Sequence, residues 1–97
     1  MLPALHTVAE TSDFIRDADA ERMPGTTRTM LKLRLAADPE AGELIVGSGG
    51  IRKLRVAGKG KGKSGGYRVL TAYVGIEAPV YLLAVLSKGD RQTFTDT

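Results

Sequence analysis

The pattern of apolar and polar residues predicts three consecutive strands in the second half of the chain. They span residues 51–56, 67–74 and 80–86, with a turn at 75–79 between the last two. In the first strand, the apolar Leu54 and Val56 alternate with the basic Lys53 and Arg55, which is typical of a strand with one buried face. The last strand is almost entirely apolar, so we expect it to be central and buried on both faces.

The first half of the chain predicts a short strand and two helices. We expect the strand over residues 6–10 and the first helix over 14–22, with Thr11-Ser12-Asp13 as its N-terminal cap. A second helix is expected to start at Thr26 or Thr27 and to run to Ala37, although residues 30–35 alternate apolar with basic residues and also fit a strand. The order β-α-α-β-β-β predicts one α+β domain over residues 1–97, with two helices packed on a mainly antiparallel sheet of about four strands.

Composition narrows the class of protein. The chain has 97 residues, enough for a modest core, and no cysteine, so it holds neither a disulfide framework nor a thiolate metal site. Its start lacks the apolar stretch of a signal peptide, and its longest apolar run, residues 80–86, is too short to cross a bilayer. We expect a soluble, cytoplasmic protein without membrane contact.

Charge is distributed unevenly along the chain. Residues 1–43 hold eight acidic and five basic side chains, whereas residues 44–97 hold three acidic and nine basic ones. No carboxylate lies between Glu43 and Glu77, and that window contains seven basic residues. A block of one sign costs self-repulsion and is typical of a site that binds a polyanion.

The stretch AGKGKGKSGG (57–66) ends its lysine series in Gly-Lys-Ser, as a nucleotide-binding loop does. Such a loop also requires a glycine at the position of Ala57 and a helix after the motif, and here a strand follows. The stretch instead favours a basic hairpin loop, in which Lys59, Lys61 and Lys63 contact a phosphate backbone without reading sequence. We expect these lysines, with Arg52, to bind a phosphate backbone rather than to catalyse.

Several motifs of this chain together resemble one toxin family. They are ETSDF (10–14), PEAGELIVGSGGIRKLRVA (39–57), the Gly/Lys loop, GGYRV (65–69) and LSKGD (86–90). In this order and spacing the chain resembles the RelE/ParE superfamily, and more narrowly the HigB-like RelE toxins of type II toxin–antitoxin systems. The chain differs from that family at its end, because related toxins usually continue with a C-terminal helix where residues 93–97 stop.

The resemblance implies an endoribonuclease that cuts messenger RNA on the ribosome and is silenced by a cognate antitoxin. Its chemistry is attack of the RNA 2′-OH on the adjacent phosphate, with no metal and no small-molecule cofactor. Arg68 is the first candidate for stabilising the transition state, because a guanidinium binds phosphate oxygens in pairs. Arg55 and Lys53 would neutralise the phosphate, with Lys53 also a candidate base, and Lys88 would serve as acid or clamp.

Other interpretations stay open at the level of sequence. The chain is alternatively a ParE-like inhibitor of DNA gyrase, or a degenerate toxin that binds RNA or antitoxin without cutting. The three tyrosines at 67, 73 and 81 are candidates for base stacking, although tyrosines in strands are more often half-buried. His6 has no nearby carboxylate partner in sequence, and Glu40 with Glu43 gives no support for the retaining carboxylate pair of sugar chemistry.

Overall fold

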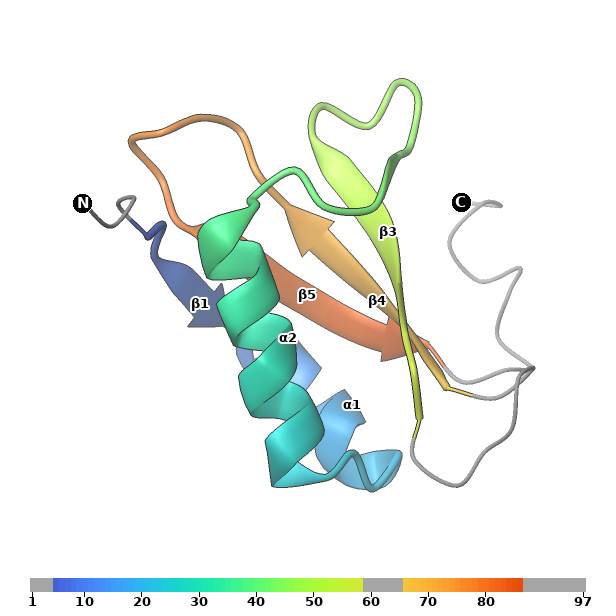
Figure 1. Ribbon diagram of the computed structural model, residues 1–97. Helices are drawn as coiled ribbons and strands as arrows, with labels where there is room; N and C mark the ends of the chain where they lie inside the picture. The colour runs from blue at the N-terminus through green and yellow to red at the C-terminus, as the bar shows by residue number, and fades with distance from the viewer. Residues whose placement is uncertain (1–4, 59–65, 87–97) are drawn as a thin grey trace.

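Two helices lie against one face of a five-stranded sheet in the computed structural model of the protein (Figure 1). The structure describes residues 5–58 and 66–86. In chain order the elements are β1 (Val8–Glu10), α1 (Ser12–Ala20), α2 (Gly25–Ala37), β2 (Glu43–Leu44), β3 (Ile51–Val56), β4 (Tyr67–Ala72) and β5 (Val80–Leu86). The expected α+β class is confirmed, and the sheet has one strand more than expected because β2 pairs with β3.

The strands follow the order β1-β5-β4-β3-β2 across the sheet. Strands β2 to β5 pair antiparallel with their neighbours, as a meander does, whereas β1 pairs parallel with β5. The last strand therefore lies between β1 and β4, inside the sheet. A bulge interrupts the pairing of β4 with β5 between Leu70 and Thr71.

Helix α1 begins two residues earlier than expected. Thr11 is its N-cap: the hydroxyl accepts a hydrogen bond from the Phe14 N–H at 3.1 Å and donates one to the Leu82 carbonyl of β5 at 2.8 Å. The same side chain thus starts the helix and ties it to the sheet. The helix ends at Ala20, before the expected residue Arg22, whose φ of 58° lies in the left-handed region.

Helix α2 settles the ambiguity of residues 30–35 in favour of a helix. Leu31 and Leu35 are buried one turn apart, which places both on the face that packs against the sheet. The expectation of a threonine cap is wrong, because Pro24 occupies the N-cap position and its carbonyl accepts the Arg28 N–H at 3.1 Å.

The hydrophobic core fills the space between the helices and the sheet. Its largest fully buried apolar side chains come from α1, α2, β4 and β5, and are Phe14, Leu35, Val69, Val80 and Leu82. The opposite face of the sheet carries no helix among the described residues (Figure 1). The prediction that β5 is buried on both faces is correct only in part. Tyr81 is 40% exposed on the helix-free face.

Strand limits differ from the expected ones by a few residues. β1 starts at Val8, two residues late, and β4 stops at Ala72, two residues early. The turn at 75–79 is confirmed, closed by a hydrogen bond from the Ala78 N–H to the Gly75 carbonyl at 3.2 Å. β3 and β5 have the predicted bounds.

Candidate nucleic-acid interface

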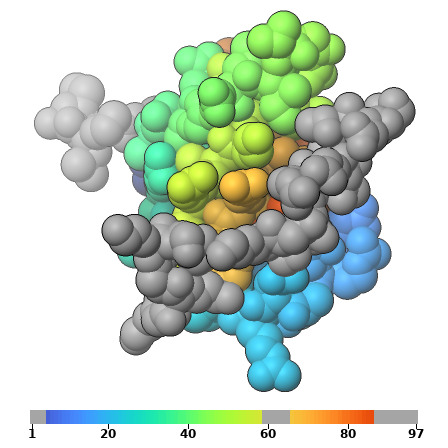
Figure 2. Space-filling model, turned by 90° about the vertical axis from the view of Figure 1, so that its right-hand side faces the viewer, coloured from blue at the N-terminus to red at the C-terminus, as the bar shows by residue number. Residues whose placement is uncertain are grey.

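Strand pairing brings three predicted catalytic cations to the helix-free face of the sheet. Leu54 of β3 and Val69 of β4 pair with each other and belong to the core on the helix side. Side chains alternate along a strand, so Lys53, Arg55 and Arg68 lie on the other side. Figure 2 shows the surfaces of β3 (yellow-green) and β4 (orange) meeting side by side.

Arg55 and Arg68 stand directly opposite each other in the antiparallel pair. The Tyr73 N–H donates to the Gly50 carbonyl at 3.0 Å, so Gly50 and Tyr73 form a hydrogen-bonded pair. Hydrogen-bonded and non-hydrogen-bonded pairs alternate along antiparallel strands. Counted from there, Arg55 and Arg68 form a non-hydrogen-bonded pair, the type in which side chains approach more closely. Like charges in this position cost stability. The pair is therefore better suited to binding an anion than to holding the fold together.

A fourth residue, Glu43, joins these cations. A hollow of about 210 Å³ is lined by Glu43, Lys53, Arg55 and Arg68. Glu43 reaches it because β2 pairs with β3, which sets Glu43 opposite Lys53. The hollow thus combines one carboxylate with three cations on three adjacent strands.

Gly42 explains how the carboxylate comes so close to β3. Its φ is 99°, and a Cβ atom at this position would lie 2.8 Å from the Lys53 carbonyl oxygen. Only glycine tolerates both this backbone conformation and this approach. Sequence reasoning does not identify Glu43 as a site residue, because a two-residue strand leaves no periodic pattern. The glycine before it is the signal that marks a close approach of two backbones.

The four side chains of the hollow form no ion pair with one another or with another described residue. Six ion pairs within 4.0 Å occur among the described residues, and none involves Glu43, Lys53, Arg55 or Arg68. Arg28 provides a contrast: it donates from Nε and Nη2 to the Glu10 carboxylate at 3.2 and 2.9 Å. A ligand in the hollow would thus find cations that form no ion pair within 4.0 Å with a carboxylate of the described residues.

Of the other predicted RNA-binding and catalytic residues, the structure describes Arg52 alone, and Arg52 does not line this hollow. Arg52 lies on the helix side of β3, with 15% of its side chain exposed and its Nη2 3.9 Å from a Glu40 carboxylate oxygen. The remaining predicted residues lie outside the described part of the chain; they are Lys59, Lys61, Lys63 and Lys88.

The aromatic candidates divide by exposure. Tyr67 is 3% exposed in the core, and Tyr73 packs edge-on against His6 with ring centroids 5.1 Å apart. The His6 Nε2 lies 2.6 Å from the Ala78 carbonyl oxygen, which gives this histidine a structural contact at the β4–β5 turn. Tyr81 alone of the three is exposed on the same face as the cations.

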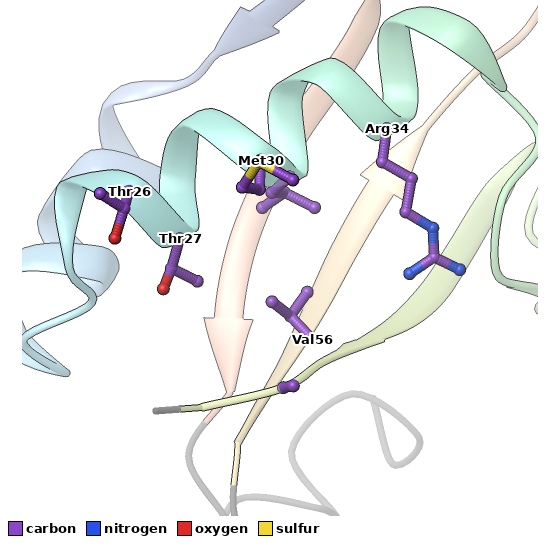
Figure 3. Close-up of a pocket in the computed structure, with 7 residues that line it drawn as sticks. Thr26, Thr27, Met30, Arg34 and Val56 are labelled. Carbon is purple, nitrogen blue, oxygen red and sulfur yellow. The ribbon is translucent and has the colours of Figure 1, made fainter. Parts of the chain in front are cut away.

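A second, more apolar groove lies between α2 and β3 (Figure 3). Its volume is about 360 Å³, and it is lined among others by Met30, Leu31 and Val56, with Arg34 at its rim. It opens on the helix side of β3, so it is separate from the cationic hollow. Its lining has one charged group and no carboxylate, and so lacks the groups for acid–base chemistry.

No protein-family model matches this chain. In the described residues, no group of three or more histidine, acidic or cysteine side chains is arranged to hold a metal ion. Neither described helix is long and apolar enough to cross a membrane. The function is therefore argued from the hollow itself.

Proposed function

We propose that the protein is the toxin of a type II toxin–antitoxin system, a HigB-like endoribonuclease that cuts messenger RNA on the ribosome. The observation that carries this proposal is the gathering of Glu43, Lys53, Arg55 and Arg68 in one hollow on the open face of the sheet. These are the group types that cleavage of RNA by its own 2′-OH requires. The proposal includes a cognate antitoxin as partner, and the cytoplasm, where messages are translated, as the place of action.

The proposed reaction is an internal transesterification. The 2′-oxygen loses its proton to a base and forms a bond to the neighbouring phosphorus, while the bond from phosphorus to the 5′-oxygen breaks. The 5′-oxygen takes up a proton, and the products end in a 2′,3′-cyclic phosphate and a 5′-hydroxyl. The enzyme must supply a base, an acid, and cations for the extra negative charge on the pentacoordinate phosphorus.

Arg55 and Arg68 are assigned to the phosphate. They stand opposite each other on neighbouring strands, so the two planar guanidinium groups can bind different oxygens of one phosphate. Because their repulsion is relieved most when the phosphate carries most charge, they stabilise the transition state more than the substrate.

Two residues are candidates for the base. A carboxylate is a common general base, and Glu43 is the one carboxylate among the residues that line the hollow. A lysine acts as a base only as a free amine, whereas its ammonium form binds phosphate directly, and Lys53 lies in the hollow beside Arg55 and Arg68. We therefore assign the base to Glu43, and to Lys53 the binding of the phosphate.

The test is cleavage of a defined message in a bacterial translation extract, read by primer extension. The wild-type protein is expected to cut within codons on ribosomes, and Arg68→Ala to lose at least a hundredfold in rate. Arg34→Ala removes the same charge from α2, away from the hollow, and should cut normally.

Three other results would contradict the proposal. Cleavage that survives Arg68→Ala would remove the hollow from the chemistry. Intact messages together with inhibited gyrase would indicate the ParE-like alternative. Intact messages with RNA bound would leave a binding protein without nuclease activity.

A further inference from the structure

Tyr81 lies on the open face of the sheet, beyond the cationic hollow. Tyr81 pairs with Ala72 of β4, and Ala72 pairs with Ile51 of β3. Paired residues point to the same face, and this is the face that carries Lys53, Arg55 and Arg68. At 40% exposure Tyr81 is much more accessible than a core tyrosine such as Tyr67. A large aromatic side chain is thus available on the surface where RNA is proposed to bind.

The neighbours of Tyr81 on this face are small. It stands between Ala72 on β4 and Ala9 on β1, its partners in the two flanking strands. Alanine methyl groups rise little above the backbone, so they leave the sides of the tyrosine ring uncovered by bulky neighbours. The residues of β5 that belong to the core cluster are Val80, Leu82 and Val85, and Tyr81 is not one of them. Its size therefore contributes little to packing of the core.

The distance between Tyr81 and the hollow fits a strand of RNA. Ala72, the partner of Tyr81, is four residues from Arg68 along β4, which is roughly 13 Å at the usual rise of a strand. A nucleotide at Tyr81 is therefore not one of the pair that flanks the cleaved bond. Between the two points the face carries Leu70 and Ala84, which are uncharged and paired with each other.

We propose that Tyr81 is a stacking platform for a base of the bound RNA, at a distance from the cleaved phosphate, so that the open face binds an extended single strand at two points. This rests on the proposed function for the identity of the ligand. Every base has a π-face, so stacking adds affinity without selecting sequence. The arginines then hold the phosphate, and the tyrosine fixes the direction in which the strand crosses the sheet.

The experiment measures binding of a short fluorescent RNA whose 2′-OH groups are methylated, so that it cannot be cut. Fluorescence anisotropy is recorded for the wild type, Tyr81→Ala and Tyr81→Phe, with Met30→Ala as a control for an exposed apolar side chain on α2. Tyr81→Ala is expected to bind about tenfold more weakly, because one base–aromatic contact is lost. Tyr81→Phe keeps the ring and should bind like the wild type, as should Met30→Ala.

Salt dependence separates stacking from charge. Tyr81→Ala should leave the slope of log affinity against log salt unchanged, whereas Arg68→Ala should make it shallower. A melting curve for each variant checks that it is folded, and Tyr81→Phe guards against a purely structural effect of removing the side chain.

The outcomes distinguish this inference from the nuclease proposal. Equal binding by Tyr81→Ala and wild type overturns the platform, even if the message is still cut in an Arg68-dependent manner. Equal losses in Tyr81→Ala and Tyr81→Phe also overturn it, because the ring would then be irrelevant. Tyr81-dependent binding without any cleavage supports the platform and contradicts the nuclease. Failure of the wild type to bind the RNA overturns the platform.

Discussion

At the scale of single residues, Thr71 is the clearest defect in the core. Its side chain is fully buried on β4, and its hydroxyl has no hydrogen-bond partner among the described residues. A buried polar group without a partner costs free energy that an apolar group of the same shape does not. The position is next to the β4–β5 bulge, where the ladder is irregular.

We expect Thr71→Val to raise the free energy of unfolding by about 1 kcal/mol, because valine keeps the branched shape and removes the unpaired hydroxyl. Urea denaturation followed by circular dichroism measures the change. Thr71→Ser is the matched control: it retains the hydroxyl, loses a methyl group and should be less stable than the wild type. A valine variant that unfolds at lower urea would indicate that the hydroxyl has a partner in solution.

Glu43 gives a second prediction at this scale. Glu43→Gln keeps the size of the side chain but removes its ability to take a proton, so the rate of RNA cleavage should fall by about a hundredfold or more. RNA binding should be equal or tighter, since a negative charge leaves a hollow that binds phosphate. Single-turnover cleavage and anisotropy measure the two quantities separately. If cleavage persists in Glu43→Gln but is lost in Lys53→Met, the base is Lys53.

At the scale of elements, a hydrogen bond between α1 and β5 attaches the helix to the sheet close to the β4–β5 bulge. The Val85 N–H, just past the bulge, donates to the Asp17 Oδ2 of α1 at 3.2 Å. Val85 lies beyond Leu82, the last residue of β5 that pairs with β1, so a helix side chain here accepts a hydrogen bond from an N–H that β1 does not reach.

Asp17→Ala should therefore lower the free energy of unfolding by about 1–3 kcal/mol, the usual cost of an unsatisfied buried donor. Hydrogen exchange measured by NMR should show faster exchange of the Val85 amide than in the wild type. Asp17→Asn retains an acceptor and should fall between the two. Unchanged exchange of Val85 in the alanine variant would mean that this hydrogen bond does not persist in solution.

The elements also show what the sequence was able to predict. β3 and β5 were predicted to the residue because alternation in one and a continuous apolar run in the other survive any tertiary context. The start of α1 was shifted because Thr11 and its two neighbours are all plausible caps, and only the bond of Thr11 to Leu82 distinguishes them. β2, with two residues, has no local pattern at all.

The same reason limits prediction of the site. Lys53, Arg55 and Arg68 were each predicted as site residues, and strand alternation within a meander is enough to place all three on one surface. Glu43 depends on the pairing of β2, which is a long-range contact. Arg52 shows the converse: it is the first residue of the cationic block in sequence, but strand alternation places it on the helix side.

At the scale of the whole molecule, the sheet separates stability from the proposed chemistry. Its covered face holds the apolar core, and there the Glu10 carboxylate accepts hydrogen bonds from Arg28. Its open face holds an exposed tyrosine and three cations that form no ion pair with another described residue. Substitutions on the two faces should therefore have opposite effects, and the facing arginines at positions 55 and 68 allow this to be tested.

Arg55→Gln should make the protein more stable at low salt while it abolishes cleavage. It removes one member of a like-charged pair that faces directly across two strands, a placement that costs a few tenths of a kcal/mol. Thermal unfolding at low salt should show a higher midpoint for Arg55→Gln than for the wild type, and the difference should vanish at about 1 M salt, where charges at this distance are screened. Arg55→Lys keeps the charge and should match the wild type in stability. A midpoint for Arg55→Gln that is lower at every salt concentration would mean that Arg55 contributes to packing, and the separation of the two faces would fail at this residue.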